Sequence, residues 1–261
     1  MSELITSAKS TFDGLGWLAN LIGIGTALIG VSFFLFKYRE AIFGTSTFYK
    51  LTTKQIKSKW HDSESIRKIA EVAIVDDNLN DFPIDELRKA GYRVKTYKQV
   101  ALNDITRLAE YDVLFLDIHG IVKDDIEEGG LKLLPKLRQT NPRQKICAVS
   151  SKTFDPTATA FFKQADDVQK KPVNAQKCQE VIDALAAEKL NPTSLAAHLD
   201  KETENLSTYK RRILLGQTRK FAATTKPLSE MFTQIDEAGK LSPALSQTLW
   251  DYLRVLRYAI S

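Results

Sequence analysis

The chain has 261 residues, of which 43% are hydrophobic and 26% charged, and its formal net charge is +5. This composition excludes a disordered protein, because it supplies enough apolar residues to bury at least one core of ordinary size. The two cysteines, Cys147 and Cys178, lack a CxxC spacing and lie in apolar or amphipathic runs, so we expect reduced packing residues in a cytosolic compartment rather than a disulfide.

A long uncharged segment lies near the start of the chain, at residues 15–36. About 20 apolar residues are enough to cross the hydrocarbon core of a membrane, so we expect a transmembrane helix that follows a short tail, residues 1–14. A cleaved signal peptide would show an early positive region and small residues at a cleavage site, whereas this run ends in phenylalanines and Lys37. A buried core helix is the other alternative, and the length of the run and its lack of a polar face count against it.

Basic residues beside this segment predict its orientation. Lys37 and Arg39 follow the apolar run, whereas Lys9 alone precedes it. Since Lys and Arg near the ends of a span are retained on the cytoplasmic side, we expect a single-pass protein of the inner (cytoplasmic) membrane with its C-terminal bulk in the cytoplasm. Residues 37–69 then form a basic juxtamembrane linker, which is either attracted to anionic lipid headgroups or simply solvated.

Small residues recur within the same segment, at every fourth position from Ala19 through Gly23 to Ala27. Such a pattern lets two spanning helices approach closely, and it therefore favours a homodimer. The alternative stays open, because small residues are common in spanning helices in any case.

From about residue 70 to 189 the pattern changes to alternating strand and helix signals. Short runs of strand-forming residues occupy 71–77, 93–98, 112–118, 145–151 and 167–171. Amphipathic runs follow them at 83–92, 102–111, 129–140, 156–165 and 174–190. Five strand-helix units of this length predict an α/β domain with a doubly wound, five-stranded parallel sheet.

Polar residues follow the expected strands where each of them ends. Asp76 and Asp77 end the first strand, Asp117 the third, Ser150 the fourth, and Lys171 the fifth. The carboxyl ends of parallel strands meet at one crevice, so these side chains should converge. The stretches VAIVDDN, VLFLDIHG and ICAVSS, together with the Lys-Pro pair after the last strand, resemble the receiver domains of two-component response regulators, which have a flavodoxin-like fold.

The resemblance implies a phosphoacceptor and a magnesium site. Asp117 would be the residue that accepts the phosphoryl group, as a carboxylate nucleophile in a reaction that needs a divalent ion. Asp77 and Asp117 would bind Mg²⁺ directly, and Asp76 would act close by or through water. The backbone carbonyl of His119 would supply a further oxygen, while its imidazole would be an exposed loop side chain. Few protein ligands completed by water and phosphate oxygens are typical of Mg²⁺.

The same resemblance assigns the remaining strand-end residues. Lys171 would pair with the phosphoryl oxygens, and the Ser150 hydroxyl would move to hydrogen-bond them after transfer. The bond between Lys171 and Pro172 would be cis. A histidine kinase or a phosphotransfer protein would be the partner that donates the phosphoryl group.

Two features depart from the family pattern. Val168 stands where receivers usually carry an aromatic switch residue, so the usual coupling is in doubt. The loop from Gly120 to Gly130 is several residues longer than usual and contains four acids, Asp124, Asp125, Glu127 and Glu128. This acidic loop could dock a partner, shield the site, or be a solvated charge run, and the last is the commonest case. A degenerate receiver whose acids form only a solvated cluster is the alternative for the whole site.

Residues 190–261 read as helical, with Asn191 and Pro192 at the boundary. Near the end of the chain, Ser242 is a candidate helix cap and Pro243 a first helical residue, before a leucine stripe. We expect a small bundle of two or three helices that binds other proteins. Nucleic-acid binding is disfavoured because the region is not strongly basic, despite a cluster at Lys210, Arg211 and Arg212.

These expectations combine into a membrane-tethered signalling protein that is phosphorylated on Asp117 and acts through its C-terminal helices. It would not be an enzyme beyond phosphorylating and dephosphorylating itself. Two alternatives remain open: a receiver-like scaffold or dimerisation module that works without phosphorylation, and a membrane effector that acts through residues 15–36.

Overall fold

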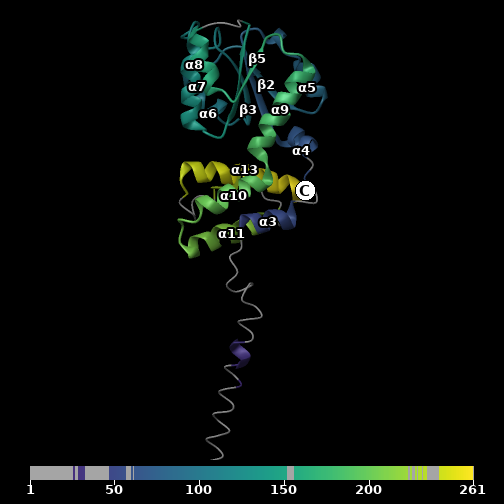
Figure 1. Ribbon diagram of the computed structural model, residues 1–261, viewed down its shortest axis with the longest axis vertical. Helices are drawn as coiled ribbons and strands as arrows, with labels where there is room; N and C mark the ends of the chain where they lie inside the picture. The colour runs from purple at the N-terminus through teal and green to yellow at the C-terminus, as the bar shows by residue number, and fades with distance from the viewer. Residues whose placement is uncertain are drawn as a thin grey trace, which may run out of the picture. The chain divides into compact units, whose positions relative to one another are not determined.

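The structure is a computed structural model of residues 1–261 (Figure 1). It describes residues 26, 29–32, 47–56, 60, 62–151, 156–222, 224, 227, 229–230, 232–233 and 241–260. The chain divides into two compact units, Met1–Ser46 and Thr47–Ser261. The sheet, the helices around it and the candidate site all belong to the second unit.

The predicted membrane location needs correction. The described residues contain no helix that is both long enough and apolar enough to cross a membrane. Within the predicted transmembrane segment 15–36, the structure describes Thr26 and residues 29–32 as helical, and the rest of the segment lies outside the described residues. The prediction of a single-pass membrane protein is therefore contradicted by the described helices.

A parallel sheet forms the centre of the second unit. Its strands are β1 (Glu71–Val75), β2 (Arg93–Tyr97), β3 (Val113–Asp117), β4 (Lys145–Ser150) and β5 (Asp167–Lys170). They lie in the order β2-β1-β3-β4-β5, and every neighbouring pair is parallel. The predicted five-stranded α/β sheet is therefore confirmed. The central strand β3 is buried along its whole length, as expected for a parallel strand covered on both faces.

Helices cover both faces of this sheet. Within the described ranges they are α5 (Ile84–Lys89), α6 (Ile105–Leu108), α7 (Gly129–Thr140), α8 (Pro156–Gln164) and α9 (Ala175–Leu190). Figure 1 shows α5 and α9 on one face and α6, α7 and α8 on the other. Because side chains alternate along a strand, Ile74 and Phe115 enter the core on the α9 side, and Val75 and Leu116 enter the core on the α7 side. Two short 3₁₀ helices, η1 (Leu79–Asp81) and η2 (Leu102–Asp104), lie in loops.

A helical layer completes the unit. It contains α3 (Phe48–Gln55), α4 (Asp62–Ile69), α10 (Pro192–Glu202), α11 (Thr208–Ala222) and α13 (Pro243–Ile260). Two of these helices, α3 and α4, come from the segment predicted as a linker. The Tyr252 ring of α13 packs edge-on against Phe48 of α3 at 5.5 Å, and its hydroxyl lies 3.0 Å from that of Thr52. The layer shares one continuous core with the α9 face of the sheet.

The ends of these helices follow from local sequence chemistry. Asn191 ends α9, and its side chain accepts a hydrogen bond from the Ser194 amide to cap α10, with Pro192 as the first residue of that helix. The Ser242 hydroxyl accepts a hydrogen bond from the Leu245 amide at 3.3 Å, as expected for the cap of α13. The last helix starts at Pro243 as predicted, and Asn191 separates α9 from α10 within the second compact unit.

A buried group of charges joins the helical layer to the sheet, and we name it the Asp112 cluster. It consists of five residues: Asp112, Arg143, Lys189, Asp251 and Arg254. The Asp112 carboxylate, just before β3, accepts hydrogen bonds from Lys189 at 2.7 Å and from Arg254 at 2.9 and 2.8 Å. Burial alone would raise the pKa of Asp112, but Lys189 and Arg254 outweigh it and hold the pKa well below its usual range.

Candidate functional site

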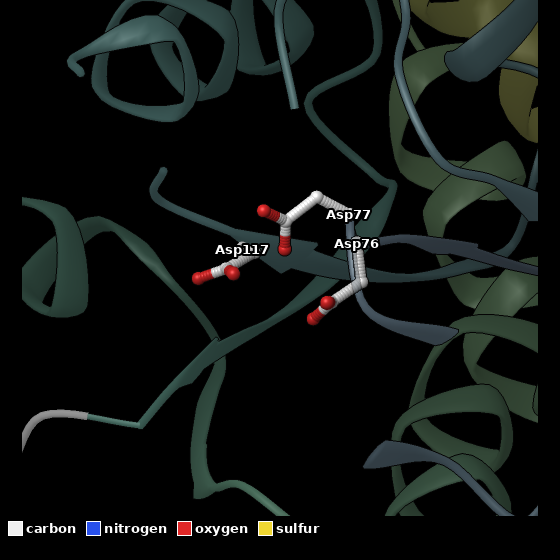
Figure 2. A group of neighbouring side chains, drawn as sticks. All are labelled: Asp76, Asp77 and Asp117. Atoms are coloured by element: carbon white, nitrogen blue, oxygen red, sulfur yellow. The ribbon is translucent and has the colours of Figure 1, made fainter. Parts of the chain in front are cut away.

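Three aspartates converge at the carboxyl ends of β1 and β3. Asp76 and Asp77 directly follow β1, and Asp117 is the last residue of β3. Figure 2 shows the three carboxylates directed toward the same space, and carboxylate oxygens of all three lie within 4.8 Å of one another. Asp76 and Asp117 are buried, whereas Asp77 is exposed. Strand pairing creates this group, because β1 and β3 are neighbours in the sheet although their ends are about 40 residues apart in sequence.

Lys171 reaches the same aspartates from the end of β5. Its Nζ atom lies 2.5 Å from Asp117 Oδ2 and 2.8 Å from Asp76 Oδ2, and a third carboxylate, that of Asp81, is 4.0 Å away. The peptide bond between Lys171 and Pro172 is cis, as expected. One ammonium group therefore faces several carboxylates.

Burial and pairing shift the pKa values of two of these groups. Burial raises the pKa of Asp76 to about 6, although hydrogen bonds from Lys171 and from the Asn78 amide favour the ionised carboxylate. Burial would lower the pKa of Lys171, but its hydrogen bonds to Asp117 and Asp76 outweigh that effect and raise it. The lysine is thus held in its charged form between two acids.

Backbone geometry fixes the aspartates. The Ile118 amide donates to Asp117 Oδ1 at 2.7 Å. Gly120 has a φ of 76°, and a β-carbon there would collide with the Asp77 carboxylate. A β-carbon on Gly130, at the start of α7, would collide with the backbone at Asp117 and Ile118. Glycines at both positions therefore let the loop after β3 fold closely over the site.

These groups open into a cavity of about 710 Å³. Its walls also include Ser150 from the end of β4, His119 from the loop after β3, and two acids of the acidic loop, Glu127 and Glu128. His119 is half-buried rather than exposed as expected, and its Nδ1 atom lies 2.5 Å from the Glu127 carbonyl. Five carboxylate side chains are therefore among the residues that line the cavity.

The acidic loop is folded back on itself rather than extended into solvent. The Gly120 amide donates to the Ile126 carbonyl at 2.7 Å, and Asp125 pairs with Lys132 of α7 at 2.5 Å. The Lys132 side chain holds the pKa of Asp125 below its usual range. The loop thus forms one wall of the cavity.

Sequence reasoning found some of the lining residues and missed others. The structure brings Asp76, Asp77, Asp117 and Lys171 into one group, with Ser150 and His119 on the wall of the same cavity. Asp81 was not predicted from the sequence, and η1 places its carboxylate near Lys171. The only signal for Asp81 was its place in the loop directly after β1. Val168, in the position of the usual aromatic switch, is 43% exposed on β5.

The donor set fits a magnesium ion. Asp76, Asp77 and Asp117 offer only hard oxygen ligands, and Mg²⁺ prefers carboxylate and water oxygens. Lys171 alone does not neutralise these three carboxylates and Asp81. A divalent cation would relieve the repulsion that remains.

Comparison with known proteins gives matches among solved structures. No protein-family model matches the chain, and no curated protein does. NtrX from Brucella abortus, solved in complex with ATP, is 20% identical, with 59% of this chain and 35% of that chain covered and a TM-score of 0.38. A CheY-like receiver domain protein from Methanospirillum hungatei is 22% identical, with 46% and 96% covered and a TM-score of 0.38. A response regulator from Thermotoga maritima is 22% identical, with 45% and 98% covered and a TM-score of 0.37. The chain thus spans about a third of the length of NtrX.

Proposed function

We propose that this chain is a phosphoacceptor signalling protein that is phosphorylated on Asp117 in a Mg²⁺-dependent reaction. The observation that carries the proposal is the meeting of three aspartates and one lysine beside a single cavity at the carboxyl edge of a parallel sheet. A buried carboxylate held beside an ammonium group and further acids is costly unless the site has a use for the arrangement. Phosphoryl transfer to a carboxylate uses each of these groups.

In the proposed reaction, Asp117 is the nucleophile. A carboxylate oxygen of Asp117 forms a bond to phosphorus while the bond from phosphorus to the donor's nitrogen or oxygen breaks, and the donor leaves with that electron pair. Lys171, now bound to Asp117 and Asp76, exchanges one carboxylate for a phosphoryl oxygen and keeps its charge. Ser150, on the cavity wall, donates its hydroxyl to the transferred group.

Asp76, Asp77 and Asp117, with the backbone carbonyl of His119, would hold the Mg²⁺ ion. When bound, the ion would neutralise negative charge on the phosphoryl oxygens and the carboxylates during transfer. A histidine kinase or a phosphotransfer protein is the proposed donor.

The helical layer is the proposed output, through contacts with another protein. Strand β3 connects the two regions directly, because Asp117 ends the strand and Asp112 precedes it. Asp112 holds Lys189 of α9 and Arg254 of α13. A change at one end of β3 thus reaches the helices through a buried ion pair rather than through solvent.

Chemical phosphorylation of the full-length chain tests this proposal. With phosphoramidate and Mg²⁺, the intact mass should increase by one phosphoryl group, and EDTA should abolish the increase. Asp117→Asn should remove it, whereas Asp124→Asn should not, because Asp124 is an exposed acid of the same loop region outside the cavity. No increase in the wild-type protein would overturn the proposal. If Asp117→Asn kept full activity in cells, the phosphorylation-independent scaffold would replace it.

A further inference from the structure

A second cavity, of about 640 Å³, lies at the opposite edge of the sheet from Asp117. It is formed by the end of α4, the turn before β2 and the last turns of α13. Four cationic side chains line it, Lys68, Arg93, Arg254 and Arg257, together with the aromatic side chain of Tyr258. Among the lining residues, all of which the structure describes, none is acidic. The cavity therefore presents a concentrated positive charge beside one aromatic ring, and it shares no residue with the cavity at Asp117.

The four cations are held in different ways. Arg254 is fixed, because its side chain is only 12% exposed and donates to the Ile69 carbonyl and to Asp112. Lys68 and Arg93 instead pair with exposed carboxylates, Glu64 at 2.6 Å and Glu71 at 2.9 Å. Exposed pairs of this kind contribute little to stability, so both cations can exchange their partner for a more highly charged one.

Contacts with neighbouring aromatic rings hold the Tyr258 and Arg257 side chains of the cavity in place. The Tyr258 ring packs edge-on against Trp60 at 6.2 Å, and the Lys68 ammonium lies 6.0 Å from the centre of the Tyr258 ring. The Arg257 guanidinium, one residue before Tyr258, stacks on Phe221 at 4.5 Å, which limits its orientations. A planar group that enters the cavity would thus meet an aromatic ring flanked by cations.

Together, these features define the kind of ligand. A guanidinium group can donate two parallel hydrogen bonds to two oxygens of one phosphate group. A phosphate group also carries more negative charge than each carboxylate that it would replace. The volume lies within the range of small-molecule sites. We propose that this cavity binds a phosphorylated small molecule of nucleotide size, with its phosphates on Lys68, Arg93 and Arg257 and a planar group against Tyr258.

A ligand in this cavity would act on the Asp112 cluster, which joins the sheet to the helical layer. Arg254 forms one wall of the cavity and also holds the Asp112 carboxylate at the start of β3. Ligand binding in this cavity requires neither Asp117 nor phosphorylation, so this proposal is independent of the proposed phosphoacceptor function.

Calorimetric titration of the full-length chain with pyrophosphate, ATP and adenosine tests the proposal. Pyrophosphate and ATP should bind, ATP more tightly, and adenosine should bind at least tenfold more weakly than ATP. Arg93→Gln and Arg257→Gln should each weaken ATP binding by about tenfold, because each removes charge-assisted hydrogen bonds. Arg88→Gln is the matched control, since Arg88 is an exposed arginine of α5 outside the cavity, and it should leave the affinity unchanged.

Glu71→Gln supplies a signature that a merely structural role would not produce. Glu71 competes for Arg93, so removing its charge should tighten ATP binding. Asp117→Asn should bind ATP like the wild type. The proposal is overturned if the wild-type chain binds neither pyrophosphate nor ATP, or if Arg93→Gln and Arg257→Gln bind ATP as tightly as Arg88→Gln does.

Discussion

Replacing Asp112 with asparagine should strongly destabilise the fold. The wild-type carboxylate accepts hydrogen bonds from Lys189, from two nitrogens of Arg254 and from the Glu71 amide, all between 2.7 and 2.9 Å. The substitution keeps the shape but removes the negative charge. Among the residues that the structure describes, Lys189, whose side chain is 2% exposed, then keeps only Asp251 at 3.8 Å as a counter-charge. Breaking a buried pair in this way costs about 3 to 5 kcal/mol, a large part of the roughly 5 to 15 kcal/mol that stabilises a typical domain.

Urea unfolding of the full-length chain, followed by circular dichroism, measures this loss. Glu64→Gln is the control, because it removes an equally short but exposed pair with Lys68 and should leave the unfolding midpoint nearly unchanged. The effect should also depend on pH. Since the pKa of Asp112 is lowered on folding from an ordinary value of 3.8, its stabilisation is present above that pH and is lost as the pH falls below it. The difference between the wild type and Asp112→Asn should therefore shrink in acid. A loss below about 1 kcal/mol at neutral pH would refute the reasoning, because only an exposed pair is worth so little.

Four further predictions concern packing and burial. Gly130→Ala should destabilise the protein by about 1 to 3 kcal/mol and impair phosphorylation, because the new β-carbon would displace the backbone at the end of β3. Gly216→Ala, in α11 with open space around the new methyl group, should instead stabilise by about 1 kcal/mol, and thermal unfolding compares the two variants. Tyr252→Phe should cost about 1 kcal/mol in urea unfolding, because it removes a buried hydrogen bond between α13 and α3. Cys147 and Cys178 are buried free thiols whose pKa burial raises, so an aromatic disulfide reagent should label them only after unfolding, and rapid labelling of the native protein would contradict their placement.

The sheet could be predicted because its signals are local. Strands β1, β3 and β4 are short apolar runs, and every strand except β2 is followed or ended by a polar site residue at its carboxyl end. The parallel arrangement therefore brings Asp76, Asp117 and Lys171 together whatever the loop lengths. The close contacts of the glycines in the loop after β3 could not be predicted from the sequence in the same way. They depend on how closely α7 starts to the end of β3, which only the folded chain determines.

The Asp112 cluster, which joins the sheet to the helical layer, was not predicted either. Lys189 and Arg254 lie 77 and 142 positions from Asp112 along the chain, and each of the three looks like an ordinary surface charge in the sequence. Charges become a buried cluster only through tertiary packing, which no local pattern encodes. The short helices α3 and α4 were missed for a related reason, since a helix of eight residues is marginal on its own and depends on tertiary packing for its stability.

Locating the phosphoryl group tests the central claim most directly. The full-length chain is incubated with phosphoramidate and Mg²⁺, the acyl phosphate is reduced with borohydride, and the modified residue is found by peptide mass spectrometry. We predict modification at Asp117, none after incubation with EDTA, and a marked decrease in Lys171→Met, which removes the ammonium group that holds the acceptor. Modification at another residue, or none at all in the presence of Mg²⁺, would contradict the proposed function.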